Sequence, residues 1–338
     1  MRRAVLYISV LLPALMLLAA CRPSVPAERR GVVIYPSDVI SVGIAGWEKR
    51  FDESGINLVG LHAATFHEPL DTLREFLQSS VGKDFLKLCR RKNVDVEYEL
   101  HVLQLLLPRE LFDSHPEYFR MDASGERQRK YNMCFTSDAA YEAMRPQLKE
   151  MMGWLKPTTH RYFLWTDDVK GAFCACEKCR VFSPSEQALI YEKRLLDMLR
   201  EYDPKATLAH LAYAQTMDAP VAVRPSEGIF LEYAPIHRDY TLPLTKENIK
   251  TLSDNLAVFP KETLHILEYW LDESMFSKWK KDKLVPLPFS EQDCRRDIVS
   301  YRHFGAASIT CFATWLNDSY EKQYGPADDA FTAYGKAF

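Results

Sequence analysis

The chain has 338 residues, of which 43 are Lys or Arg and 46 are Asp or Glu, so its formal net charge is −3. A charge this close to zero argues against nucleic-acid binding and against a polybasic membrane-binding surface. Residues 31–338 are enough to bury a large core, and their number falls in the range of a single (β/α)8 barrel.

The N-terminal segment predicts export. Arg2 and Arg3 precede an apolar stretch over residues 4–18, and the segment ends in LAAC at Cys21. This ending is similar to a bacterial lipobox, which implies cleavage before Cys21 and attachment of fatty acyl chains such as palmitate through a diacylglyceryl group. An uncleaved anchor helix and an ordinary cleaved signal are the alternatives.

Residues 1–21 are therefore expected to be a lipoprotein signal peptide, and residues 22–30 (RPSVPAERR) a short polar tether. No later segment is apolar enough to cross a membrane. We expect an exported protein that is lipid-anchored to a bacterial cell membrane, at the outer membrane or the cell surface.

Short apolar runs alternate with amphipathic helical patterns in the body of the chain, which predicts βαβ units and a parallel sheet. Eight candidate strands favour closure into a TIM-like (β/α)8 barrel, a single domain over residues 31–338. A doubly wound open sheet competes with the barrel, but the sequence lacks the Gly-rich nucleotide turn typical of it. The expected strands are residues 32–35, 57–62, 94–103, 162–167, 208–213, 229–236, 264–270 and 308–315, and the expected helices are residues 70–92, 138–155, 184–202, 243–257 and 290–303.

Two features of this body lie outside the regular pattern. Residues 105–137 form a connection too long for a plain linker, and such loops are usually functional. If residues 94–103 are a barrel strand, this insertion lies over the mouth of the barrel. The chain also ends at Phe338, soon after the last expected strand, which leaves open a clipped final helix.

The most informative segment is RYFLWTDDVKGAFCACEKCR, residues 161–180. An apolar strand runs into Asp167 and Asp168, and the capping box of Ser183 and Glu186 then starts a helix. Catalytic residues of (β/α)8 barrels lie at the C-terminal ends of strands. Two such carboxylates can hydrolyse glycosides of N-acetyl sugars by substrate assistance, an exception to the usual nucleophile and acid. The alternative is that one aspartate caps a turn or binds a structural ion.

Three cysteines follow the aspartates as C-x-C-x-x-C: Cys174, Cys176 and Cys179. Cys134, in the long insertion, is the natural fourth member. The four can form a structural zinc site with four cysteine ligands, but an oxidising compartment favours disulfides, and disulfide is the preferred interpretation here. The remaining cysteines, Cys89, Cys294 and Cys311, are expected to be buried thiols.

Other strand ends also carry acids beside aromatic residues, a combination that suits sugars. Each such residue alone is more easily explained as a core aromatic or a paired acid, but the pattern recurs. One expected strand also places Glu97, Glu99 and His101 on one side, with a structural role for Glu97. The candidates for substrate binding are Glu99, His101, Glu232, Tyr233, Glu268, Trp270, Asp272, Trp315 and Asn317.

Taken as a set, several segments resemble the bacterial domain-of-unknown-function 4838 family. They are EYELHVLQLLLPRELFDSHPEYFRMDASGERQRKYNMCF, RYFLWTDD, FCACEKCR, SPSEQ, IFLEYAPIHRDY and LEYWLDES, within residues 47–317. Some members are classed as glycoside hydrolase family 163, endo-β-N-acetylglucosaminidases acting on complex N-glycans. The aspartate pair is also similar to that of O-GlcNAcase-type enzymes, which implies that Asp167 holds the acetamido group and Asp168 is the general acid/base.

The resulting hypothesis is a hydrolase of β-linked N-acetylglucosaminides in glycans or glycoproteins. It implies no organic cofactor, and a structural zinc is the one metal that the sequence suggests. A non-catalytic glycan-binding lipoprotein on a degenerate barrel is the main alternative, and a hydrolase with a Cys-bound catalytic zinc is a weaker one. The sequence does not indicate the linkage, endo or exo action, or the oligomeric state.

Overall fold

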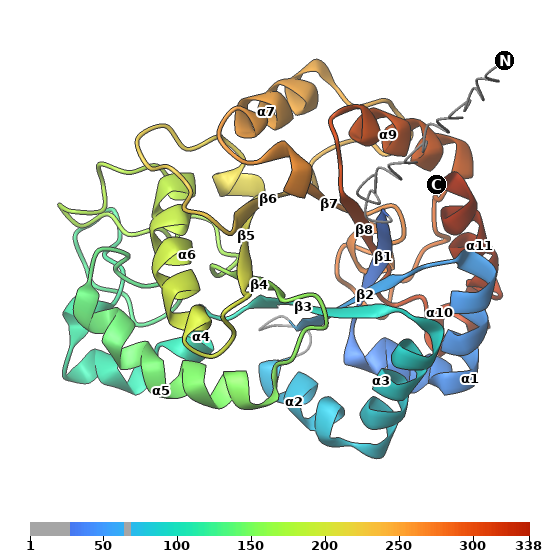
Figure 1. Cartoon of the computed structure of the whole chain (residues 1–338), viewed down its shortest axis with the longest axis horizontal. Helices are drawn as coiled ribbons and strands as arrows, with labels where there is room; N and C mark the ends of the chain where they lie inside the picture. Colours follow the sequence, from blue (N-terminus) through green and yellow to red (C-terminus); the bar gives the residue numbers. More distant parts are fainter. Residues whose placement is uncertain (1–27, 64–68) are drawn as a thin grey trace, which may run out of the picture.

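The chain forms a closed barrel of eight parallel strands in sequence order, with β1 beside β8. The structure is a computed structural model, and it describes residues 28–63 and 69–338. Figure 1 shows the strands around the centre of the molecule and the helices outside them. The expected (β/α)8 barrel is therefore confirmed. The strands are β1 Arg29–Ile34, β2 Leu58–Ala63, β3 Asp95–His101, β4 Arg161–Trp165, β5 Thr207–Ala212, β6 Ile229–Tyr233, β7 His265–Glu268 and β8 Ser308–Phe312.

The helices connect these strands and cover the outside of the barrel. The α-helices are α1 Pro36–Ser54, α2 Leu70–Gln78, α3 Ser80–Lys92, α4 Leu103–Leu106, α5 Asp138–Trp154, α6 Pro184–Arg200, α7 Lys246–Leu256, α8 Glu273–Phe276, α9 Glu291–His303, α10 Asp318–Tyr324 and α11 Asp328–Ala337. Four short 3-10 helices are η1 Arg109–Asp113, η2 Pro116–Tyr118, η3 Ala214–Thr216 and η4 Lys261–Thr263. None of the helices in the described ranges is both long and apolar enough to cross a membrane.

The expected N-terminal boundary needs one correction. The signal segment, including Cys21, lies outside the described residues. Strand β1 begins at Arg29, inside the expected tether of residues 22–30, because Arg29 and Arg30 pair with Ser308 and Ile309 of β8.

At the other end of the chain, α11 packs against α1 and α9, so β8 is followed by a helix on the barrel surface. Buried Arg50 of α1 holds this region together. Its guanidinium donates hydrogen bonds to the carbonyl of Leu316 (3.1 Å), to Asp328 (3.0 Å) and to Glu321 (2.8 Å). It also lies 4.4 Å from the ring centre of Phe331, a cation–π contact.

Alternate residues of each strand point into the barrel. The inward positions of β3, β4 and β6 include Glu99, Phe163 and Glu232, which meet across the interior. The next residue along each strand packs outward against the helices. This alternation decides which side chain at each strand end can reach the mouth.

The long insertion folds as α4, η1, η2 and a short antiparallel bridge between Met121 and Arg127. It lies against the C-terminal end of β4, as expected. The backbone amide of Ala175, in the loop after β4, donates to the carbonyl of Met121 (2.7 Å). Asn132 of the insertion is hydrogen-bonded to Asp167.

Candidate active site

A cavity of about 340 Å³ opens at the C-terminal ends of the strands. Its size is at the lower end of the usual range for ligand pockets, about 300–1,000 Å³. Three carboxylates line it: Asp167 and Asp168 after β4, and Asp272 after β7. The cavity is thus where the barrel fold places ligand chemistry.

Asp167 is held in place by the insertion. Its Oδ2 accepts the backbone N–H of Asn132 at 2.5 Å and lies 4.0 Å from the guanidinium of Arg109. In return, the side-chain oxygen of Asn132 accepts the N–H of Asp167 at 2.8 Å. The other carboxylate oxygen, Oδ1, is buried and has no hydrogen-bond partner among the described residues.

Burial raises the pKa of Asp167 above its usual value, and the charge of Arg109 and the nearby backbone amides of Asn132 and Gln104 only partly offset this. The carboxylate is therefore poorly solvated, and the oxygen without a partner is left for a ligand that brings its own N–H or O–H. Asp167 lines the cavity, so such a ligand can reach it.

Asp168 differs from its neighbour because it is exposed to solvent at the cavity. The hydroxyl of Tyr213, which follows β5, donates to its Oδ2 at 3.4 Å. Burial and the negative charge of Asp168 raise the pKa of Tyr213, so the phenol keeps its proton at neutral pH. Two adjacent aspartates thus occupy different environments, one fixed and desolvated and the other accessible.

Aromatic rings form much of the remaining wall. Tyr35, Trp165, Tyr269 and Phe312 line the cavity, and Tyr269 stacks on Phe312 with ring centres 5.3 Å apart. Trp279 also lines the cavity and is 49% exposed. Such flat apolar surfaces beside carboxylates suit the two faces of a sugar ring.

Two histidines complete the floor. His101, a predicted contact residue, lines the cavity, and its Nδ1 is 2.6 Å from the carbonyl of Thr166. His62, which sequence reasoning missed, has its Nδ1 2.6 Å from the carbonyl of Glu99. Because a carbonyl can only accept, each Nδ1 carries the proton and each Nε2 is an acceptor in the neutral ring.

Asp272, the third carboxylate, is already hydrogen-bonded to other residues of the protein. Its Oδ1 accepts hydrogen bonds from the hydroxyls of Ser274 (2.6 Å) and Thr314 (2.6 Å) and from the N–H of Met275 (3.2 Å). Burial raises its pKa. The residue is at the cavity as expected, but its bonds make it the N-cap of α8.

Two further predicted acids lie below the cavity. Glu99 and Glu232 are fully buried in the barrel interior with His265, and one ligand-type atom of each lies within 4.8 Å of the others. Trp165 separates them from the cavity and donates its indole N–H to Glu232 at 2.8 Å. Neither Glu99 nor Glu232 lines the cavity, because both lie deeper in the barrel interior.

Glu97 lies deeper still in the interior, where it accepts a hydrogen bond from Thr159 (2.6 Å) and lies 3.4 Å from Arg161.

The other predicted substrate contacts point away from the cavity, since they occupy outward positions. Tyr233 donates its hydroxyl to the carbonyl of Asn248 in α7 at 2.9 Å. Glu268 accepts from Arg238 at 3.0 Å and from the hydroxyl of Tyr301, between β7 and α9. These bonds hold both side chains within the helix layer.

Trp270, Trp315 and Asn317 belong to the same outer layer. Trp270 is buried and lies beside Tyr334 of α11, with ring centres 6.2 Å apart. Trp315 is also buried, and the amide of Asn317 donates to Asp38 of α1 at 2.7 Å. The structure brings none of the three to the cavity.

The insertion also places two residues at the site that the sequence did not suggest: Tyr131 lines the cavity, and Asn132 is buried against Asp167. Tyr131 and Asn132 have left-handed φ angles of 60° and 44°, which bring the insertion back over Asp167. Neither follows a strand, so the position of catalytic residues at strand ends did not mark them. Tyr213, by contrast, is the last residue of the expected strand 208–213, so the position of catalytic residues at strand ends could have identified it.

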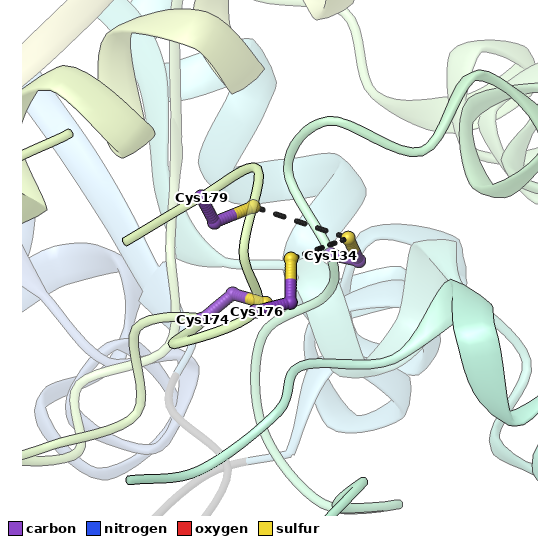
Figure 2. Close-up of side chains that lie close together, drawn as sticks. All are labelled: Cys134, Cys174, Cys176 and Cys179. Carbon is purple, nitrogen blue, oxygen red and sulfur yellow. Dashed lines mark hydrogen bonds between the residues drawn. The ribbon is translucent and has the colours of Figure 1, made fainter. Parts of the chain in front are cut away.

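The four cysteines Cys134, Cys174, Cys176 and Cys179 lie together behind Asp167, as expected, and all four are buried. Figure 2 shows their sulfur atoms pointing toward one another. The sulfur of Cys134 is 3.7 Å from that of Cys176 and 3.9 Å from that of Cys179, and all four thiols are free. The preferred disulfide interpretation is therefore not what the structure shows. Cys89, Cys294 and Cys311 are buried free thiols, as expected.

Comparison with known proteins gives one family. The profile described as domain of unknown function (DUF4838) matches residues 67–273. A search of curated protein sequences found no match.

Solved structures with a similar barrel include several sugar-cleaving enzymes. A β-galactosidase from the psychrophilic Marinomonas ef1 has 14% identity and a TM-score of 0.45, covering 91% of this chain and 59% of its own. Gan42B, a GH42 β-galactosidase from G. stearothermophilus, has 13% identity and a TM-score of 0.49, covering 91% and 56%. The GH20 modules of the pneumococcal exo-β-D-N-acetylglucosaminidase StrH have 10% identity and a TM-score of 0.49, covering 92% and 85%.

The chain thus spans less than two thirds of the length of the two β-galactosidases. Similarity at this level is too low to carry a substrate or a reaction from those proteins to this chain.

Proposed function

The chain belongs to the DUF4838 family, and from this premise we propose that it is a glycoside hydrolase that cleaves β-linked N-acetylglucosaminides by substrate assistance. The observation that carries the proposal is the unequal pair of adjacent aspartates. Asp167 is anchored through one oxygen and leaves the other without a partner, while Asp168 is exposed in the same aromatic cavity.

In this mechanism the acetamido oxygen of the substrate attacks the anomeric carbon. Asp167 accepts the acetamido N–H, which increases the nucleophilicity of that oxygen and stabilises the positive charge of the oxazolinium ion. A desolvated carboxylate suits this role, because its charge is not already neutralised by water. The insertion supplies the rigid support, since Asn132 and Arg109 fix the oxygen that does not contact substrate.

Asp168 acts as the general acid/base. It donates a proton to the glycosidic oxygen as the bond to the anomeric carbon breaks. It then takes a proton from the water that attacks this carbon and opens the ring of the intermediate. Exposure to solvent allows that water to reach it, and the Tyr213 hydroxyl orients the carboxylate.

The wall and the size of the cavity are consistent with one sugar residue at the two acids. Its volume of about 340 Å³ suits a single ring, with the rest of the glycan outside. Trp279 is exposed at the cavity and provides a surface for a sugar beyond that ring. We therefore propose N-glycan-type glycans or glycoproteins as substrates, in keeping with the family resemblance.

The test is release of glycans from a complex N-glycoprotein by the wild type, Asp168→Asn and Asp167→Asn. The wild type should release glycan. Asp168→Asn should lose about 10²–10⁴-fold in rate on poor leaving groups and much less on activated aryl glycosides. Asp167→Asn should slow every substrate.

Asp84→Asn is the matched control, because Asp84 is an exposed acid of α3 that pairs only with Lys87 among the described residues. It should act as the wild type. Retention of glycan by a folded wild type that releases nothing, with binding unaffected in both active-site variants, would identify a glycan-binding protein instead.

We also propose export and lipid anchoring through Cys21, which lies outside the described residues. Cells expressing the wild type and fed a labelled fatty acid should incorporate the label into the protein. Cys21→Ala should abolish incorporation, and a labelled Cys21→Ala protein would contradict the proposal.

A further inference from the structure

The four buried cysteines behind the cavity have the geometry of a tetrahedral metal site. At a Zn–S distance of about 2.3 Å, tetrahedral coordination places sulfurs about 3.8 Å apart. The separations of Cys134 from Cys176 and Cys179 are 3.7 and 3.9 Å, and all four sulfurs lie within 4.8 Å of one another. Sulfurs in a disulfide are about 2.05 Å apart.

We propose that Cys134, Cys174, Cys176 and Cys179 bind one Zn²⁺ ion that fastens the long insertion to the loop after β4. Four thiolates in tetrahedral geometry select zinc among common divalent ions. The cluster contains no histidine, carboxylate or open position, so the ion is structural and does not act on substrate.

The surroundings of the sulfurs fit thiolate ligands. The backbone N–H of Met121 donates to the sulfur of Cys174 at 3.3 Å, and the hydroxyl of Thr136 is 3.4 Å from the sulfur of Cys179. The guanidinium of Arg127 contacts the sulfur of Cys134 and brings a positive charge. Such donors offset the net charge of −2 of a zinc ion with four thiolates, and outer contacts of this kind orient metal ligands.

The loop that carries three of the ligands is hydrogen-bonded to α6. The buried side chain of Gln187, in the first turn of α6, accepts the N–H of Cys174 at 2.9 Å. Its amide group lies 3.2 Å from the carbonyls of Cys174 and of Cys179, as a hydrogen-bond donor. One half of the site is thus attached to the barrel, and Cys134 is the ligand that the insertion contributes.

Two of the proposed ligands lie close in sequence to the residues that hold Asp167. Cys134 is two residues after Asn132, which bonds Asp167, and Cys174 is two residues after Ala172, whose carbonyl accepts the side-chain N–H of Asn132 at 3.0 Å. A metal ion bound by the cysteines therefore connects the two segments that Asn132 already joins, and Asn132 is the residue that holds Asp167. The ion would hold the insertion in the position that the cavity requires.

The test is metal and thiol analysis of the protein, expressed with its N-terminal segment and purified without chelators. The wild type should contain about one zinc per chain. All four thiols should be free after denaturation in the presence of chelator. Cys176→Ser should lose the zinc, while Cys89→Ser, the same change at a buried thiol outside the cluster, should keep it.

A second measurement does not depend on a folded variant. A thiol-reactive mercurial added to native wild type should release about one zinc per chain, seen with a chromogenic chelator. Removal of the ion should lower the Tm by about 10 °C. Iron instead of zinc, two disulfides among the four cysteines, or no bound metal in the folded wild type would overturn the proposal. None of these readouts requires hydrolase activity.

Discussion

Asn132 is the residue whose replacement tests most directly how the cavity is built. Its side chain accepts the N–H of Asp167 at 2.8 Å and donates to the carbonyl of Ala172 at 3.0 Å, and the residue is fully buried. Alanine removes both bonds. It leaves a buried N–H and a buried carbonyl without partners, and it places a residue with little tolerance for φ > 0 at a φ of 44°.

Each buried group left without a partner costs about 1–3 kcal/mol. The left-handed conformation adds about 1 kcal/mol for alanine. We therefore expect Asn132→Ala to lower the free energy of unfolding by about 3–7 kcal/mol, and the Tm by about 10 °C in a chain of this size. Urea denaturation and thermal unfolding followed by circular dichroism measure both quantities.

Asn93→Ala is the matched control. Asn93 also has a left-handed φ, 54°, but it is an exposed C-cap residue of α3, far along the chain from the cavity. It should lose only about 1 kcal/mol. A loss of less than about 1.5 kcal/mol for Asn132→Ala, or equal losses for the two variants, would refute the assignment of Asn132 as a buried anchor.

Three further predictions concern charge. Because burial raises the pKa of Asp167 and the proposed role needs its ionised form, activity should fall with decreasing pH through a midpoint above 3.8; a midpoint at or below 3.8, in a protein that stays folded, contradicts that role. Burial, together with the negative charge of Glu232, raises the pKa of Glu99 well above 4.5, so wild-type stability should decline as pH rises past 4.5. Glu99→Gln should therefore be more stable than the wild type at pH 8 by about 1 kcal/mol or more, and equal to it near pH 4 in urea titrations. Arg50→Met should destabilise the protein by about 2–4 kcal/mol in thermal unfolding, because it leaves partly buried acids unpaired. The control is Lys49→Met, at an exposed residue that shares one of those acids, and it should cost less than about 1 kcal/mol. Similar losses for both variants would contradict the role of Arg50.

The barrel could be predicted because its signal is periodic. Each of the eight expected strands overlaps an observed strand, and the inward side of β3, with Glu97, Glu99 and His101, follows directly from alternation. A strand that is buried on both faces nevertheless has no polar side to identify. The sequence therefore did not reveal that Tyr233 and Glu268 face the helices.

The candidate site was predictable only where it coincides with strand ends. Asp167 and Asp168 lie two and three residues after the end of β4, and His101 ends β3. Asn132, in contrast, reaches Asp167 through two consecutive left-handed residues in the insertion of residues 105–137, and such a path depends on tertiary contacts. The cysteine spacing predicted the cluster, but spacing alone does not distinguish a shared metal from paired disulfides.

The order in which the cysteines occur along the chain also bears on how the protein folds. Cys134 is separated from Cys176 and Cys179 by 42 and 45 positions, and a loop of this length closes slowly because the unfolded chain samples many arrangements. We expect the insertion to become ordered only after β4 and the first turn of α6 have formed, because these elements carry its contacts. In pulse-labelling hydrogen exchange during refolding, amides of residues 118–134 should gain protection together with those of residues 174–187, and later than β2 and β3. Such a result would show that the mouth of the barrel is the last part of this half of the chain to fold.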